Sequence, residues 1–208
     1  VADQAIVTVT ENPVPDAGTD GSLIICGSSA PTGLFPLLVG AQPGGTWVAP
    51  GGGAFTGTYD PAANAPGAYI YTVNGTAPCT ADQATVTVTE NVAPNAGADG
   101  SLDVCSTSPS IALFPELSGA DGGGVWTAPG GGVFSGTYDP VVDAPGIYTY
   151  TVNGVAPCPA DGSTVTVAEN GAPDAGADGA LTICGSAPAA ALFPLLAGAQ
   201  AGGTWTAP

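Results

Sequence analysis

The chain has 208 residues and no Lys, Arg, His or Met, against 17 Asp and Glu residues, so its formal net charge is −17 at neutral pH. Because no cationic side chain is present to neutralise phosphates, we expect neither nucleic acid binding nor attraction to anionic lipid surfaces. No apolar run approaches the roughly 20 residues that cross a bilayer, so we expect no direct membrane insertion.

A repeat of 79 residues organises the whole sequence. Cys26, Cys105 and Cys184 recur at this spacing without insertion or deletion, and the three Trp residues do the same. Pro-rich segments mark the boundaries between copies, and we expect the chain to be a stretch of a longer array. The predicted parts, in chain order, are the last strand of a preceding module at 1–12, Ig-like repeat modules at 13–91 and 92–170, and the first part of a third, truncated module at 171–208.

Short β-strands separated by turns account for most of the second copy. Along 147–152, Tyr148, Tyr150 and Val152 lie on one face, as the two-residue period of a strand requires. Asn153-Gly154 follows and predicts a two-residue hairpin turn. Many short strands and no amphipathic helix predict an all-β fold of tandem Ig-like β-sandwich modules. The other predicted elements are strands at 101–105 and 125–127, a helical turn or packed loop at 111–117, a strand from Val133 to Tyr138 and a last strand at 164–167.

The five cysteines predict disulfides rather than a metal site. Without His and without a C-x-x-C pair they do not fit zinc, and they indicate an oxidising, extracellular compartment. Two pairings fit the repeat. Pairing within modules joins Cys26 to Cys79 and Cys105 to Cys158, and it leaves Cys184 unpaired by truncation. Pairing across modules joins Cys79 to Cys105 and Cys158 to Cys184. The first set is favoured because it does not cross the Pro-rich boundaries, and each such loop stabilises a module by about 4 kcal/mol.

Acidic residues beside each boundary form a candidate calcium site. Ca²⁺ takes six to eight oxygens, which three side chains, backbone carbonyls and water supply together. Asp next to Gly is also an ordinary turn former, and this second interpretation is favoured. No cofactor is required, and calcium at module junctions is the one metal considered. Its candidate ligands are Glu11, Asp16 and Asp20, then Glu90, Asn95 and Asp99, then Glu169, Asp174 and Asp178.

The three tryptophans, one in each copy of the repeat, have two possible roles. Trp47, Trp126 and Trp205 are predicted core anchors, because one Trp in a small sandwich usually packs at its centre. The alternative is an exposed platform that binds sugar.

Without His or Lys the chain has no conventional base for a Ser or Cys nucleophile. We therefore predict no catalytic residue and no enzymatic activity.

Four phrases of the sequence resemble a known group of repeats. They are E-N-x-x-P-D-A-G-x-D-G-x-L-x-x-C at 11–26, L-F-P-L-L at 34–38, G-G-T-W at 44–47 and G-x-Y-x-Y-T-V-N-G-x-A-P-C-x-A-D at 67–82. These phrases are similar to repeats in very large surface proteins of Bacteroidota, which resemble gliding-motility adhesins and related type IX-secreted proteins. The resemblance implies a filamentous or stalk-like adhesin on the outer surface of a bacterial cell, and it carries over no catalytic residue.

Three functions remain open from the sequence. The leading hypothesis is a structural one, in which disulfide-stapled modules form the stalk or filament shaft of a cell-surface adhesin. In the second, the modules themselves bind carbohydrate or a surface, with or without Ca²⁺. In the third, strands exchange between copies and polymerise a filament. The partners these hypotheses require are neighbouring modules of the same chain, other copies in a filament and surface glycans.

Overall fold

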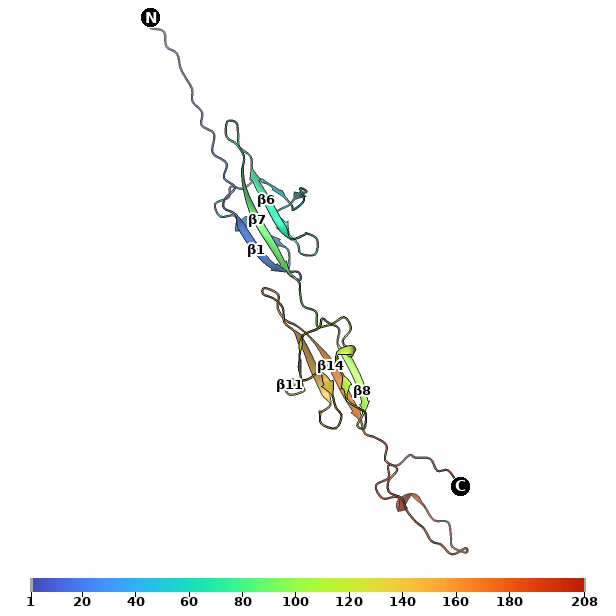
Figure 1. The fold of residues 1–208 in the computed structure, drawn as a ribbon. Helices are drawn as coiled ribbons and strands as arrows, with labels where there is room; N and C mark the ends of the chain where they lie inside the picture. Colours follow the sequence, from blue (N-terminus) through green and yellow to red (C-terminus); the bar gives the residue numbers. More distant parts are fainter. Residues whose placement is uncertain (1, 208) are drawn as a thin grey trace. The chain divides into compact units, whose positions relative to one another are not determined.

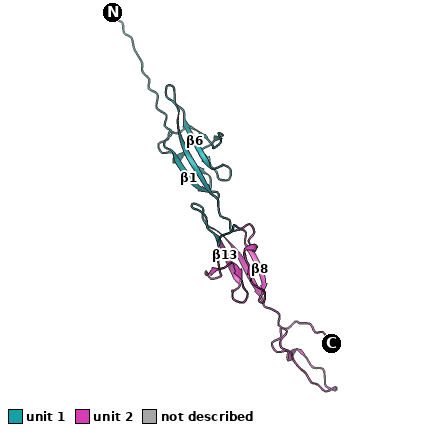
Figure 2. Cartoon of the chain, viewed as in Figure 1, with its two compact units in different colours: residues 1–96, 121–124, 151–162 teal, residues 97–120, 125–150, 163–208 magenta. Residues whose placement is uncertain are grey.

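The structure is a computed structural model that describes residues 2–207. The chain divides into two compact units (Figure 2). Unit 1 comprises residues 1–96, 121–124 and 151–162, and unit 2 comprises residues 97–120, 125–150 and 163–208. Apart from three short 3₁₀ turns, every regular element between residues 2 and 207 is a β-strand. In that range no helix has the length and apolar character to cross a membrane. The module boundaries after residues 12, 91 and 170 stay a prediction.

The first copy of the repeat is built on a five-stranded sheet in the order β1-β7-β6-β3-β4. Figure 1 labels β1, β7 and β6 of this sheet. Strand β1 pairs in parallel with β7, and the other pairs are antiparallel. The parallel register sets Cys26, the last residue of β1, opposite Asn91, the last residue of β7. The strands are β1 (Gly21–Cys26), β3 (Thr46–Val48), β4 (Ala54–Phe55), β6 (Gly67–Val73) and β7 (Asp82–Asn91).

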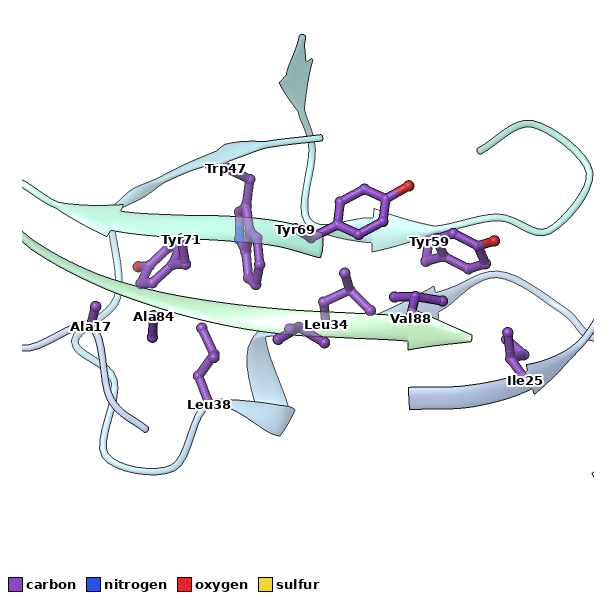
Figure 3. Packing of buried hydrophobic residues seen from close by; sticks show 11 residues of the cluster. Ala17, Ile25, Leu34, Leu38, Trp47, Tyr59, Tyr69, Tyr71, Ala84 and Val88 are labelled. Carbon is purple, nitrogen blue, oxygen red and sulfur yellow. The ribbon is translucent and has the colours of Figure 1, made fainter. Parts of the chain in front are cut away.

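A second, smaller layer completes the first copy. It consists of the antiparallel pair β2 (Thr32–Gly33) and β5 (Thr58–Tyr59) and of the 3₁₀ turn η1 (Phe35–Leu37). Leu34 and Leu38 flank η1 and are buried against the aromatic and aliphatic side chains of the main sheet (Figure 3). Because side chains alternate along a strand, every second residue of β6 and β7 faces this core. The buried residues so placed are Tyr69 and Tyr71 on β6, and Ala84, Val86 and Val88 on β7.

The second copy has the same elements in the same order. Its main sheet runs β11-β10-β13-β14-β8, and β8 pairs in parallel with β14, so that Cys105 lies opposite Asn170. The chain is therefore all-β, with two similar Ig-like sandwich modules in tandem. The elements are β8 (Gly100–Cys105), β9 (Ile111–Ala112), η2 (Phe114–Glu116), β10 (Val125–Thr127), β11 (Val133–Phe134), β12 (Thr137–Tyr138), β13 (Gly146–Val152) and β14 (Asp161–Asn170), followed in the third copy by η3 (Phe193–Leu195).

The predicted two-residue hairpin turn at Asn153-Gly154 is wrong. Such a turn needs positive φ at both residues, and no non-glycine residue between 2 and 207 has one. The connection from β13 to β14 instead spans 153–160 and contains a cis Ala156-Pro157 bond. Glycine is required at position 154 for another reason: a Cβ there would lie 2.5 Å from the carbonyl oxygen of Cys158.

The three tryptophans do not share one environment. Trp47 and Trp126 are each 8% exposed, whereas Trp205 is 60% exposed. The ring of Trp47 lies 4.9 Å from that of Tyr71 and 6.2 Å from that of Phe55. The positions that correspond to these two residues in the third copy would fall beyond residue 208. In this structure Trp205 is not buried as Trp47 and Trp126 are, and its role as a core anchor stays a prediction.

Candidate functional site

The structure joins Cys26 to Cys158, and both residues belong to unit 1. The Cα atoms are 4.9 Å apart, and the two residues are 132 positions apart in the sequence. This bond links a cysteine of the first copy to one of the second. It corresponds to neither predicted set, since Cys79, Cys105 and Cys184 are free thiols.

Strand direction explains why Cys26 does not pair with Cys79. Cys26 lies opposite Asn91 at the end of β7, whereas Cys79 precedes Asp82, where β7 begins. Ten residues of strand separate these two ends by about 33 Å at the usual rise per residue. A disulfide needs Cα atoms within about 7 Å. The same topology in the second copy separates Cys105 from Cys158, so the predicted pairings within modules are corrected.

Asn91 holds the loop that carries Cys158. Its side-chain Nδ2 donates to the carbonyl oxygens of Ala156, at 2.8 Å, and Val155, at 3.4 Å. Its own carbonyl oxygen accepts the N–H of Gly27 at 2.9 Å. That oxygen also lies 3.4 Å from Cys158 Sγ. We call the group formed by Cys26, Asn91 and residues 155–158, all in unit 1, the disulfide site.

Sequence reasoning did not single out Asn91. The Glu-Asn pair recurs at 11–12, 90–91 and 169–170, and this recurrence was the signal that could have found it. The Asn side chain is needed because its amide supplies the donor for two carbonyl oxygens of the loop. The role of the pair becomes visible only when β7 is placed beside β1.

Most of the candidate calcium ligands are engaged in separate hydrogen bonds. Asp20 Oδ1 accepts the N–H of Thr85, and Asp99 Oδ1 accepts that of Thr164, both at 2.7 Å. Between residues 2 and 207 no group of three His, Cys, Asp or Glu side chains could hold a metal ion. Calcium binding stays a prediction. Of the other candidates, Asp16 and Asp174 each accept the N–H of the glycine two residues later at 2.8 Å. The N–H of Asn95 donates to the carboxylate of Asp121. Glu11 and Asp178 are exposed.

The remaining two candidates, Glu90 and Glu169, each accept a hydrogen bond from a buried tyrosine. The hydroxyl of Tyr59 donates to Glu90 Oε2 at 2.6 Å, and that of Tyr138 donates to Glu169 Oε2 at 2.8 Å. Both tyrosines have no exposed surface. Burial first, and then the hydrogen bond and negative charge of the glutamate, raise the pKa of each tyrosine well above its ordinary value.

Alkaline pH is expected to destabilise the protein through these tyrosines. Above about pH 10 the unfolded chain loses tyrosine protons that the folded chain retains. Stability is therefore fully present below the unfolded pKa and is lost as pH rises toward the folded pKa. Urea unfolding at a series of pH values from 8 to 11, with the free thiols alkylated, measures the slope.

The double variant Tyr59→Phe/Tyr138→Phe is the control for this pH dependence. It keeps the aromatic rings but removes both titrating hydroxyls, so its unfolding free energy is expected to fall less steeply with pH. Burial also raises the pKa of Tyr69 and Tyr148, so some slope remains in the variant. An unchanged slope would show that the pair of tyrosine–glutamate hydrogen bonds is not the cause.

Comparison with known proteins finds only distantly similar solved structures. No protein-family model matches the chain, and no curated protein matches it. It is similar to the crystal structure of the insect immune protein hemolin, at 12% identity and a TM-score of 0.46. The match covers 77% of this chain and 47% of the hemolin chain. The domain arrangement of hemolin is described as having implications for homophilic adhesion. It is also similar to immunoglobulin domains 1–5 of Sidekick-1, at 15% identity and a TM-score of 0.30, covering 78% and 42%. The match thus spans less than half of the chain in either solved structure.

Proposed function

We propose that the chain is a structural spacer, a run of disulfide-linked Ig-like modules that forms the shaft of an adhesin or filament on a bacterial cell surface. The observation that carries this proposal is the bond between Cys26 and Cys158, which joins one copy of the repeat to the next. A spacer must transmit force between its ends without unfolding. The covalent connection between copies provides this property.

The mechanical consequence follows from the connectivity alone. Tension applied to the two ends of the chain passes through the Sγ–Sγ bond and bypasses residues 27–157. The bypassed segment contains most strands of both sandwiches, including all of β6 and β7. These strands are held only by hydrogen bonds and packing, which yield at lower force than a covalent bond. The disulfide therefore shields the strands between residues 27 and 157 from the load, whereas β1 and β14 still carry it.

The chemistry of the chain suits an extracellular and non-catalytic role. Disulfides persist in oxidising compartments such as the outer surface of a bacterial cell. A net charge of −17 with no cationic side chain opposes non-specific association. The recurring carboxylates of Asp20, Asp99, Glu90 and Glu169 are engaged with backbone N–H groups or tyrosine hydroxyls. The buried positions of Trp47 and Trp126 do not favour a sugar-binding platform.

Single-molecule stretching tests the spacer function. The oxidised chain, held at its two ends, is expected to extend less on complete unfolding than the reduced chain. The disulfide removes 132 residues of contour, which corresponds to roughly 450 Å at the length of an extended residue. The measurement compares the extension of single molecules before and after a reductant is added.

A matched variant and a binding assay complete this test. Cys158→Ser, stretched without reductant, is expected to give the extension of the reduced chain. If the native oxidised and reduced chains extend equally, no load bypasses the sheets and the spacer proposal loses its support. Specific binding of the chain on a glycan array would instead favour the alternative, in which the modules recognise carbohydrate.

A further inference from the structure

The three free cysteines occupy positions equivalent to those of the bonded pair. Cys79 has the position of Cys158, in the loop that precedes the last strand of its copy. Cys105 and Cys184 have the position of Cys26, which ends the first strand. We call the first kind loop cysteines and the second kind strand cysteines. The Cys26–Cys158 bond joins a strand cysteine to the loop cysteine of the following copy.

The loop that carries Cys79 is held as the loop of the bonded Cys158 is held. Asn12 Nδ2 donates to the carbonyl oxygens of Ala77, at 2.9 Å, and Thr76, at 3.4 Å. Asn91 makes the same two bonds to the loop of Cys158, at 2.8 and 3.4 Å. Cys79 Sγ lies 3.8 Å from the carbonyl oxygen of Asn12. Cys79 is therefore placed for the same bond, with a strand cysteine as its partner.

The strand cysteines also share their surroundings with Cys26. The sulfur of each lies close to the hydroxyl of the residue two positions later: 3.3 Å for Cys26, 3.3 Å for Cys105 and 3.5 Å for Cys184. At Cys105, the carbonyl oxygen of Asn170 accepts the N–H of Ser106 at 2.9 Å, just as Asn91 accepts that of Gly27. In the first two copies, the end of the first strand therefore lies beside the same Asn carbonyl group of the last strand.

Hydrogen bonds to these sulfurs also favour the reactive thiolate. The side chain and N–H of Thr107 lower the pKa of the Cys105 thiol, although burial and the charge of Glu169 oppose them. The side chain and N–H of Ser186 lower the pKa of the Cys184 thiol, which burial opposes. Because the thiolate is the attacking species, a larger thiolate fraction speeds disulfide exchange.

We propose that the Cys26–Cys158 bond is one step of a disulfide ladder, in which every strand cysteine pairs with the loop cysteine of the next copy of the repeat. Cys79 pairs with the strand cysteine of a preceding copy, and Cys105 and Cys184 pair with loop cysteines of following copies. The partner is another copy of this repeat, in the same polypeptide or in a second chain. The ladder goes beyond the proposed spacer function and does not depend on it, because it rests only on the equivalent surroundings of the strand cysteines and the loop cysteines.

The bond forms by thiol–disulfide exchange with a low-molecular-weight disulfide such as oxidised glutathione. One cysteine thiolate attacks a sulfur of the oxidant and releases one small thiolate, which leaves a mixed disulfide on the protein. The second cysteine thiolate attacks the protein sulfur of that mixed disulfide and releases the second small thiolate. The two cysteines lose two protons and two electrons in all, and the oxidant is reduced to two thiols.

Between two chains, the expected pair is Cys79 of one chain with Cys184 of the other. At Cys105 the place beside the first strand is taken by β14 of the same copy. Residues 179–184 have no paired strand between residues 2 and 207. Residues 3–12 correspond to β7, yet they form no strand and expose Ile6 and Val7 by 91% and 87%. These residues of a second chain therefore fit beside 179–184 in the register of β1 and β7, which brings Asn12 and Cys79 to Cys184.

The first experiment oxidises the reduced 208-residue chain with oxidised glutathione. Linked peptides are identified by mass spectrometry after cleavage at Asp and Glu, because the chain has no Lys or Arg for trypsin. The expected products are the Cys26–Cys158 bond within a chain and the Cys79–Cys184 bond between chains, in oligomers that a reductant dissolves. Cys79→Ser is expected to abolish the oligomers and to keep the internal bond. Cys105→Ser is the matched control and is expected to leave the oligomers unchanged.

The second experiment tests a partner in the same polypeptide. Residues 130–208 are repeated after residue 208, which continues the 79-residue register and supplies a new loop cysteine. Cys105 is expected to pair with Cys158 of the appended segment inside a monomer. A strand-to-loop bond other than Cys26–Cys158 in either experiment supports the ladder and identifies its source. If Cys79 and Cys105 both stay reduced, or if Cys79–Cys79 and Cys184–Cys184 bonds form as readily as Cys79–Cys184 bonds, the ladder is overturned.

Discussion

Replacing Cys158 with Ala is expected to lower the free energy of unfolding of the oxidised chain by about 4 to 5 kcal/mol. The bond to Cys26 closes a loop across 132 positions, and the chain-entropy model assigns that stabilisation to a loop of this length. The bond restricts the unfolded chain without adding a contact to either sheet. Urea unfolding followed by far-UV circular dichroism measures the change.

Cys79 provides the matched control for this experiment. It has the same position in the first copy and a free thiol, so Cys79→Ala is expected to leave the unfolding free energy of the single chain nearly unchanged. In the presence of a reductant, the native chain and Cys158→Ala should unfold at nearly the same urea concentration. Equal losses for the two variants, or a loss that persists in reductant, would assign the effect to packing of the side chain and not to the disulfide.

Replacing Trp47 with Ala is expected to cost about 3 to 5 kcal/mol of unfolding free energy, as the loss of a large buried aromatic side chain usually does. The indole packs edge-on against Phe55 and tilted against Tyr71, with ring centroids 6.2 and 4.9 Å away. The main chain at Gly57 also approaches it closely, since a Cβ at that position would lie 3.0 Å from Trp47 Nε1. Truncation therefore leaves a cavity that the neighbouring sheet cannot fill.

Substitutions of the other two tryptophans serve as comparisons for the loss of unfolding free energy in Trp47→Ala. Trp126 lies 5.0 Å from Tyr150 and 6.4 Å from Phe134, so Trp126→Ala is expected to match Trp47→Ala. Trp205 has the same position in the repeat but is 60% exposed, so Trp205→Ala is expected to cost less than about 0.5 kcal/mol. Circular dichroism in urea compares all three without depending on the removed fluorophore. Similar costs for Trp47 and Trp205 would contradict the assigned core.

The strands were predictable from the sequence because their signal is local. Alternation along 147–152 placed Tyr148 and Tyr150 on one face, and both are buried in the structure. The predicted last strand at 164–167 has the same period, and its Val165 and Val167 are 0% and 2% exposed. The two-residue period of a strand is a property of its own backbone, so it is visible without knowledge of the partner strand.

The hairpin and the carboxylates were not predictable in the same way. Asn153-Gly154 satisfies the local rule for a tight turn, but the neighbouring loop that carries Cys158 sets a longer connection. Asp20 stands beside Gly, as a turn residue does, yet its carboxylate accepts the N–H of Thr85 on β7. Glu90 accepts a hydrogen bond from Tyr59, 31 residues earlier. The positions of both carboxylates depend on partners that are distant in the sequence.

The sequence by itself determined the 79-residue period, the all-β class and the absence of cationic side chains. Only the tertiary structure decided which cysteines meet. The decisive fact is the parallel pairing of β1 with β7, which sets Cys26 beside Asn91 and far from Cys79. Strand pairing is set by contacts across the whole module, so residue spacing alone does not determine it. Because of this pairing, the observed disulfide joins successive copies of the repeat, whereas the sequence had predicted disulfides within each module.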